Sequence, residues 1–144
     1  YSVPGYPWGS NSDILNRALV LGVAHDVTGK RAYRDAALGA MDYVLGRNPL
    51  DQSYVTGYGA RPMQNPHHRF WARQIDARYP PPPPGALSGG PNNTNMSDPI
   101  AQKLRRTCKA QTCWADHIES FALNEVAVNW NAPLVWVAAF LDER

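Results

Sequence analysis

Two stripes of apolar residues at helical spacing, joined by a short turn at Gly29, constrain the fold more than any other feature. Apolar residues that recur three or four positions apart lie on one face of an α-helix, and burial of that face brings helices together. The first stripe is Ile14, Leu15, Ala18, Leu19, Gly22 and Val23, and the second is Tyr33, Ala36, Ala37, Ala40, Met41 and Val44. Two such helices in sequence predict an αα-hairpin and an all-α chain.

The ends of this hairpin are marked by capping and breaking residues. The run SNSD at residues 10–13 combines a capping residue with an acid three positions on, which predicts that the first helix is capped there. The second helix is expected to stop at Gly46, because Pro49 follows just beyond it.

Two further helices are predicted in the second half of the chain. Asp98 followed by Pro99 is typical of a cap and a first-turn proline. Asn131 is a good cap, and Pro133 is tolerated only in a first turn. The predicted helices run over residues 100–106 and 131–141.

Residues 47–97 lack helical periodicity. Alternation across residues 53–58 allows a short strand, and the prolines of residues 80–84 favour an extended polyproline conformation. An irregular segment of this length inside a compact domain is usually functional or disordered. Its aromatic residues argue against disorder, so we expect functional loops.

Composition narrows the class of protein. The 144 residues suffice for one domain, and 44% hydrophobic with 18% charged residues is globular. A formal net charge of +2 is too small to indicate a surface that binds nucleic acid. No apolar run approaches the roughly 18 residues that span a membrane. The chain opens on YSVPGYPWGS without a signal peptide. Neither a nucleic-acid nor a membrane partner is expected.

The two cysteines, Cys108 and Cys113, are separated by four residues. A metal site would need more ligands nearby, and only His117 is close, so no metal site is expected. A short-loop disulfide is the favoured interpretation and would fit a secreted, extracellular protein. A pair of reduced core thiols is the alternative.

Three acids, Asp116, Glu119 and Glu125, stand just ahead of the most hydrophobic run of the chain. A buried carboxylate is costly unless it is paired or hydrogen-bonded. Such an acid therefore either caps or pairs with a neighbour, or it is kept protonated so that it donates its proton in a reaction. Glu125 falls in the connection before the last helix, where a carboxylate can face a cleft.

The stretch NPHHRFW in the middle of the chain contains a second polar cluster. His67 and Arg69 are two residues apart, so in an extended backbone both project from one face while His68 points away. Pro66 favours this extended geometry. An imidazole beside a guanidinium suits the binding of sugar oxygens or of a carboxylate, although ordinary surface residues are the alternative.

The stretches SYVTGYGARPMQNPHHR and WADHIESFALNEVAVNWNA resemble, position by position, the two active-site signatures of glycoside hydrolase family 9. The first match comprises Ser53, Thr56, Gly59, Arg61, Pro66, His67 and Arg69. The second comprises Trp114, Asp116, Phe121, Glu125, Ala127, Asn131 and Ala132. The segments YPWGSNSDILNRA, MDYVLGRNPLDQSYVTGYG and GALSGGPN also look like this family, and NWNAPLVWV is most similar to bacterial members.

The resemblance implies a hydrolase, an inverting cellulase that is mostly of the endoglucanase (endo-β-1,4-glucanase) type, on an (α/α)6 barrel of six helical hairpins. By the family's pattern Glu125 is the general acid, and Asp116 and His67 count with it among the catalytic residues. His67 and Arg69 contact the sugar next to the scissile bond, and we expect Asp116 to orient a neighbour or to tune the local field, since an ionised second carboxylate helps to keep Glu125 protonated. Trp130 stands where the family often has Tyr; it can stack on a pyranose ring but cannot supply a phenol hydroxyl. The chemistry needs no cofactor, and family members often bind a structural calcium, whose ligands the sequence does not place.

Inversion also needs a base carboxylate, which in this family comes from a DAGD-like segment near the N-terminus of the domain. No aspartate of this chain lies in such a motif. Residues 1–144 are therefore expected to be the C-terminal portion of the catalytic domain, with the N-terminal portion and a cellulose or other β-glucan chain as partners. The chain alone is expected to be inactive.

Two other functions remain open. One is an exo-acting member of the family, of the β-glucosidase or glucosaminidase type. The other is a non-catalytic carbohydrate-binding module with Trp71, Trp114 and Trp130 as its platform, which the helical periodicity disfavours because such modules are usually β-sandwiches.

Overall fold

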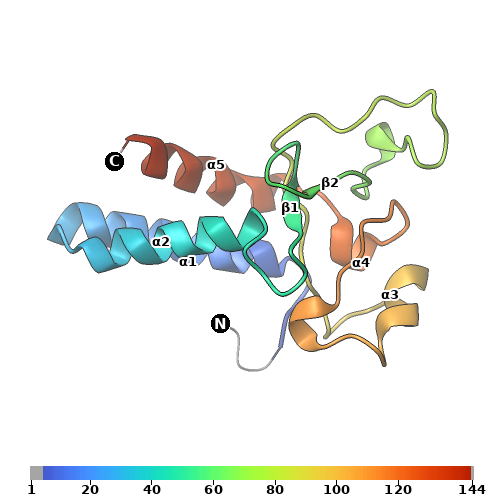
Figure 1. Cartoon of the computed structure of the whole chain (residues 1–144), viewed down its shortest axis with the longest axis horizontal. Helices are drawn as coiled ribbons and strands as arrows, with labels where there is room; N and C mark the ends of the chain where they lie inside the picture. Colours follow the sequence, from blue (N-terminus) through green and yellow to red (C-terminus); the bar gives the residue numbers. More distant parts are fainter. Residues whose placement is uncertain (1–4, 144) are drawn as a thin grey trace.

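In a computed structural model, which describes residues 5–143, three long helices pack side by side. They are α1 (Ser10–Thr28), α2 (Arg31–Val44) and α5 (Val128–Glu143). Figure 1 shows α5 lying along the α1–α2 hairpin, with the shorter elements gathered beyond one end of the three helices. The apolar stripes meet in a core that includes Leu15, Ala18, Ala37, Met41, Val44, Leu134, Val137 and Phe140. The predicted hairpin is confirmed.

The predicted cap of the first helix is wrong. The N-cap of α1 is Gly9, and no side chain caps the helix. The polar side chains at its start bond to a distant loop instead: Ser10 Oγ donates to the Pro91 carbonyl at 2.6 Å, and Asn11 Nδ2 donates to the Ser88 carbonyl at 3.1 Å. These residues anchor the helix to the loop rather than close its first turn.

The predicted cap of the last helix is also wrong, for a similar reason. Helix α5 begins at Val128, so Asn131 lies within it, as does Pro133. The Asn131 amide accepts from the Leu87 N–H at 2.8 Å and donates to the Leu87 carbonyl at 3.2 Å. Its side chain therefore links α5 to the loop at residue 87.

The remaining elements are short. The predicted third helix is confirmed as α3 (Pro99–Leu104), capped by Asp98, and a four-residue helix, α4 (Phe121–Asn124), precedes Glu125. Single 3₁₀ turns, η1 (Arg69–Trp71) and η2 (Ala110–Thr112), complete the helical elements. No helix or strand is assigned to the proline run of residues 80–84.

The expected strand is present as β1 (Ser53–Thr56), which is buried throughout and pairs in parallel with β2 (Pro62–Met63). Val55 also pairs with Leu87 in an antiparallel bridge. The irregular middle of the chain is thus ordered by pairing between its own distant parts.

Cys108 and Cys113 form a disulfide, as the sequence predicts. It links Cys108, four residues beyond the end of α3, to the residue after η2. Among residues 5–143, none of the helices combines the length and the apolar character that crossing a membrane would require.

The close approach of Gly90 to Asn11 provides a test of how α1 is anchored. A Cβ at Gly90, where φ is +92°, would lie 2.3 Å from Asn11 Cγ. We expect Gly90→Ala to lower the free energy of unfolding by about 3–5 kcal/mol, because it adds left-handed strain and displaces a buried side chain. Urea unfolding of the complete catalytic domain measures this loss. Gly29→Ala is the matched control, since φ is +68° there but no atom lies within 4 Å of the added methyl, and we expect a loss of about 1 kcal/mol. Equal losses of stability in Gly90→Ala and Gly29→Ala would contradict the close approach of Gly90 to Asn11.

Candidate active site

The carbonyl groups around α4 are bonded to other parts of the chain. A helix leaves its last four carbonyls without partners, and α4 has only four residues, so outside donors are needed. Those donors, for the carbonyls of Ala122, Leu123, Asn124 and Glu125 in turn, are Asn92 Nδ2 at 2.9 Å and the backbone N–H groups of Gly90 at 3.0 Å, His67 at 3.0 Å and Gly89 at 2.8 Å. The backbone that carries Glu125 is therefore joined to two loops.

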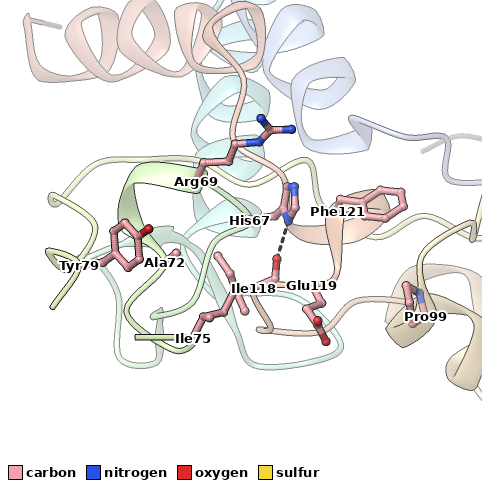
Figure 2. A pocket seen from close by; sticks show the side chains of 9 residues that line it. All are labelled: His67, Arg69, Ala72, Ile75, Tyr79, Pro99, Ile118, Glu119 and Phe121. Atoms are coloured by element: carbon pink, nitrogen blue, oxygen red, sulfur yellow. Dashed lines mark hydrogen bonds between the residues drawn. The ribbon is translucent and has the colours of Figure 1, made fainter. Parts of the chain in front are cut away.

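His67 lies directly beside this segment. Its backbone pairs with Glu125 in an isolated parallel bridge. Its Nδ1 is hydrogen-bonded to the Ile118 carbonyl at 2.5 Å, as drawn in Figure 2. Because a carbonyl only accepts, Nδ1 carries the hydrogen and Nε2 of the neutral ring remains an acceptor. The ring also packs edge-on against Phe121, with the centroids 5.7 Å apart.

Asp116 holds the backbone just before His67. Its Oδ2 accepts from the Gln64 N–H and its Oδ1 from the Asn65 N–H, both at 2.7 Å. Asn124 Nδ2 donates to the Asn65 carbonyl at 2.6 Å. The residues that lead into His67 are thereby fixed from both sides by the segment that leads into Glu125.

A cavity of about 540 Å³ opens beside His67. Figure 2 shows the nine side chains around it, which include Phe121, Ile118, Ile75 and Tyr79 as apolar and aromatic walls and Glu119 as an acid. His67 and Arg69 both line it, as the alternation of side chains predicts. His68 instead accepts from the Phe70 N–H and stacks on Trp71, with the centroids 3.9 Å apart. The cavity has the mixture of apolar walls and a few polar groups that small-molecule sites show.

The walls contributed by residues 72–79 were not predicted from the sequence. Gln74 Oε1 accepts from the Ile118 N–H at 2.8 Å and so attaches this loop to the segment before α4. Arg78 is hydrogen-bonded to Asp76 and holds the pKa of that carboxyl below its usual range. No periodicity in this stretch marks Ile75 or Tyr79 as lining residues, so the sequence carries no signal for them.

The two acids of the predicted site do not line this cavity. Glu125 is half-buried, and its carboxylate makes no hydrogen bond or ion pair with residues 5–143. Asp116 borders a smaller hollow of about 220 Å³ that is also lined by Arg61 and Trp114. The chain thus brings Glu125 beside His67 through the backbone and leaves the Glu125 carboxylate without a partner from the described residues.

The tryptophans occupy different surroundings. Trp130 packs on the backbone of Gly9 and Gly89 at the start of α5, outside the cavity of His67. Trp114 is buried against Tyr54, and its Nε1 donates to Ser88 Oγ at 3.2 Å. Trp114 is thus mostly buried, which disfavours the alternative of a binding platform formed by Trp71, Trp114 and Trp130. A sugar contact by Trp130 stays a prediction.

Within residues 5–143, no three His, Cys, Asp or Glu side chains gather closely enough to hold a metal ion.

Comparison with known proteins identifies relatives over nearly the whole chain. The sequence model described as "Glycosyl hydrolase family 9" matches residues 1–138. A cellulose 1,4-beta-cellobiosidase of Acetivibrio thermocellus is 53% identical over 139 residues, which is 96% of this chain and 16% of that protein. Endoglucanase C of Cellulomonas fimi is 42% identical over 148 residues, which is 100% of this chain and 13% of that protein.

Solved structures similar to this chain include endoglucanases as well. A single mutant (D468A) of a thermostable endoglucanase from Alicyclobacillus acidocaldarius superimposes with a TM-score of 0.84 at 42% identity, over 96% of this chain and 26% of that one. AaCel9A in complex with cellobiose-like isofagomine gives 0.81 at 43% identity, over 95% and 26%. The chain thus spans about a quarter of these structures. The predicted fold class, a helical portion of an (α/α)6 barrel, is confirmed.

The contacts of Asp116 lead to a prediction about the loop before His67. Asp116→Ala removes both acceptors, so we expect the amide hydrogens of Gln64 and Asn65 to exchange with solvent at least about tenfold faster. Hydrogen exchange followed by NMR or mass spectrometry measures this. Asp116→Asn is the control, because one remaining oxygen can protect only one of the two amides. Unchanged exchange in the alanine variant would show that the two bonds do not hold the loop.

Proposed function

The chain belongs to glycosyl hydrolase family 9, and from this premise we propose that the whole protein hydrolyses β-1,4-glucosidic bonds of cellulose or a related β-glucan by an inverting mechanism. The observation that carries the proposal for this chain is the backbone pairing of His67 with Glu125. It keeps a proton donor and a sugar-binding imidazole in adjacent positions. Both polar stretches of the two signatures therefore serve one site.

In the proposed mechanism Glu125 is the general acid. It gives its proton to the departing glycosidic oxygen while a water attacks the anomeric carbon from the opposite face. The base that activates this water would lie about 6.5–9.5 Å away, on the N-terminal portion of the domain. The Glu125 carboxylate has no partner within residues 5–143, which leaves it available to a substrate.

The other residues bind and orient the sugar. The Nε2 of His67 accepts a hydrogen bond from a sugar hydroxyl, because Nδ1 is already bonded to Ile118. Arg69 donates to sugar oxygens on the same side of the cavity. Asp116 acts through the backbone at residues 64 and 65 rather than on the substrate.

An exo-acting enzyme is the second candidate, because the relative at 53% identity is named a cellobiosidase. Endo action is named for the Cellulomonas fimi relative and for the Alicyclobacillus acidocaldarius structure. The loops that would close one end of the cleft decide between the two, and viscosity loss against reducing-end release on a soluble cellulose derivative distinguishes them. We further propose that the protein is secreted, which the disulfide supports.

Replacing Glu125 by Gln tests the acid. In the complete catalytic domain we expect Glu125→Gln to lower kcat on cellulosic substrates by about 10²–10⁴, because the amide cannot donate a proton to the leaving oxygen. Affinity for cellobiose, measured by calorimetry, should stay within about threefold since the shape of the side chain is kept. Glu143→Gln is the control, because it makes the same substitution at an exposed acid at the end of α5, outside this cavity. Full turnover in Glu125→Gln would contradict the proposal.

The 144-residue chain alone should not hydrolyse cellulose, because it supplies no base. It also leaves apolar side chains uncovered on the outer helices: Val20 is 65% exposed, Val27 80% and Val135 68%. Such surface favours a partner. We expect inactivity and self-association of the isolated chain by light scattering, and recovery of activity when the N-terminal portion is co-expressed. Turnover by a monodisperse isolated chain would overturn both expectations.

A further inference from the structure

Asp98 is a buried carboxylate that the proposed mechanism does not use. Its exposed fraction is 0%. Its Oδ1 accepts from the Ala101 N–H at 2.6 Å, and its Oδ2 accepts from the Ala122 N–H at 2.8 Å. We infer that Asp98 is a positioning residue that fixes the short helix α4 and thereby the acid at the residue after it. This inference rests on the proposed role of Glu125.

The requirement for a carboxylate at this position does not come from α3 alone. Capping a helix takes one acceptor, which Ser, Thr or Asn supplies as well as Asp. Asp98 uses its first oxygen for that purpose, within α3, and its second for Ala122, which lies 24 residues further along the chain. An ionised carboxylate is acceptor-only on both oxygens, whereas an asparagine side chain presents one acceptor and one donor. Only the acid satisfies both N–H groups.

The bond to Ala122 acts where α4 has least support of its own. The first N–H groups of a helix have no partner inside it, and α4 is too short to be stable through its own hydrogen bonds. Asp98 takes the Ala122 N–H, and the fully buried Asn92 donates to the Ala122 carbonyl at 2.9 Å. Ala122 is thus held on both sides, three residues before Glu125.

No charge pairing explains the burial of Asp98. In the part of the chain that the structure describes, the ion pairs are Arg47 with Asp42 and Arg78 with Asp76, so Asp98 has no basic partner there. A carboxylate is costly to bury, and here two backbone N–H groups stabilise it. The buried Asp98 carboxylate therefore needs both hydrogen bonds, and the bond to Ala122 ends on α4, the helix just before Glu125.

Loss of the second bond should therefore affect proton donation in particular. Small displacements of a catalytic group lower the rate strongly, by up to about a hundredfold for 1 Å. A leaving group that needs a proton from Glu125 suffers from such a displacement. An activated aryl leaving group departs as a stable anion without that proton, so its release is insensitive to where the acid lies.

The test uses Asp98→Asn and Asp98→Ser in the complete catalytic domain with two substrates. One is a soluble cello-oligosaccharide, and the other is the dinitrophenyl glycoside of cellobiose. We expect kcat on the oligosaccharide to fall about ten- to a hundredfold while KM changes less than about twofold, and kcat on the aryl glycoside to fall less than about threefold. The ratio of the two rates, taken on one sample, does not depend on how much of a variant is folded. Both variants keep an acceptor for the α3 cap.

Two controls separate the possible failures. Asp42→Asn makes the same substitution at an ion-paired acid on α2 and should leave both rates unchanged. Glu125→Gln should give the same split between substrates, only larger. A split in Glu125→Gln with equal losses, or no loss, in the Asp98 variants overturns the inference alone. No split in Glu125→Gln overturns the proposed function, and the inference with it.

Discussion

A helix of four residues cannot satisfy its own backbone, and the candidate site depends on how this chain solves that problem for α4. The carbonyls from Ala122 to Glu125 each accept a hydrogen bond from a residue at position 67 or between 89 and 92. Every one of these donors lies in a loop far from α4 in sequence. The carbonyls in and just after this short helix thus join the loops at residue 67 and at residues 89–92 at one place.

The long helices take part in the same network through their polar residues. Asn11 on α1 donates to the Ser88 carbonyl, and Asn131 on α5 exchanges hydrogen bonds with Leu87. The loop just before residues 89–92 is consequently attached to both helices. Burial of polar groups is costly unless they are bonded, and here the buried Asn11 Nδ2 and both polar atoms of the half-buried Asn131 side chain bond to the loop backbone. The helical core thus sets where the loops of the site lie.

How much the sequence predicted follows from the range of the interactions. The hairpin of α1 and α2 was predicted because helical periodicity is a local property, and the shared orientation of His67 and Arg69 follows from alternation within three residues. The predicted caps at Ser10 and Asn131 were wrong because the hydrogen-bond partners of these side chains lie 81 and 44 residues away. Local sequence patterns carry no information on partners at that distance. The assignment of Glu125 as the general acid came from the family signatures. Periodicity and spacing alone did not distinguish a structural acid, which caps or pairs with a neighbour, from a proton donor.

The described residues position Glu125 more completely than they bury the apolar surface of the helices. The backbone around Glu125 and His67 is satisfied by bonds within residues 5–143, so the geometry of the acid is encoded in this part of the protein. The outer faces of α1 and α5, in contrast, leave Val20, Val27 and Val135 exposed. Hydrogen bonds are directional and fix positions, whereas apolar burial is non-directional and supplies most of the free energy of folding. Placement of Glu125 is thus encoded within residues 5–143, while the exposed apolar side chains on α1 and α5 add little to the free energy of folding unless another surface covers them.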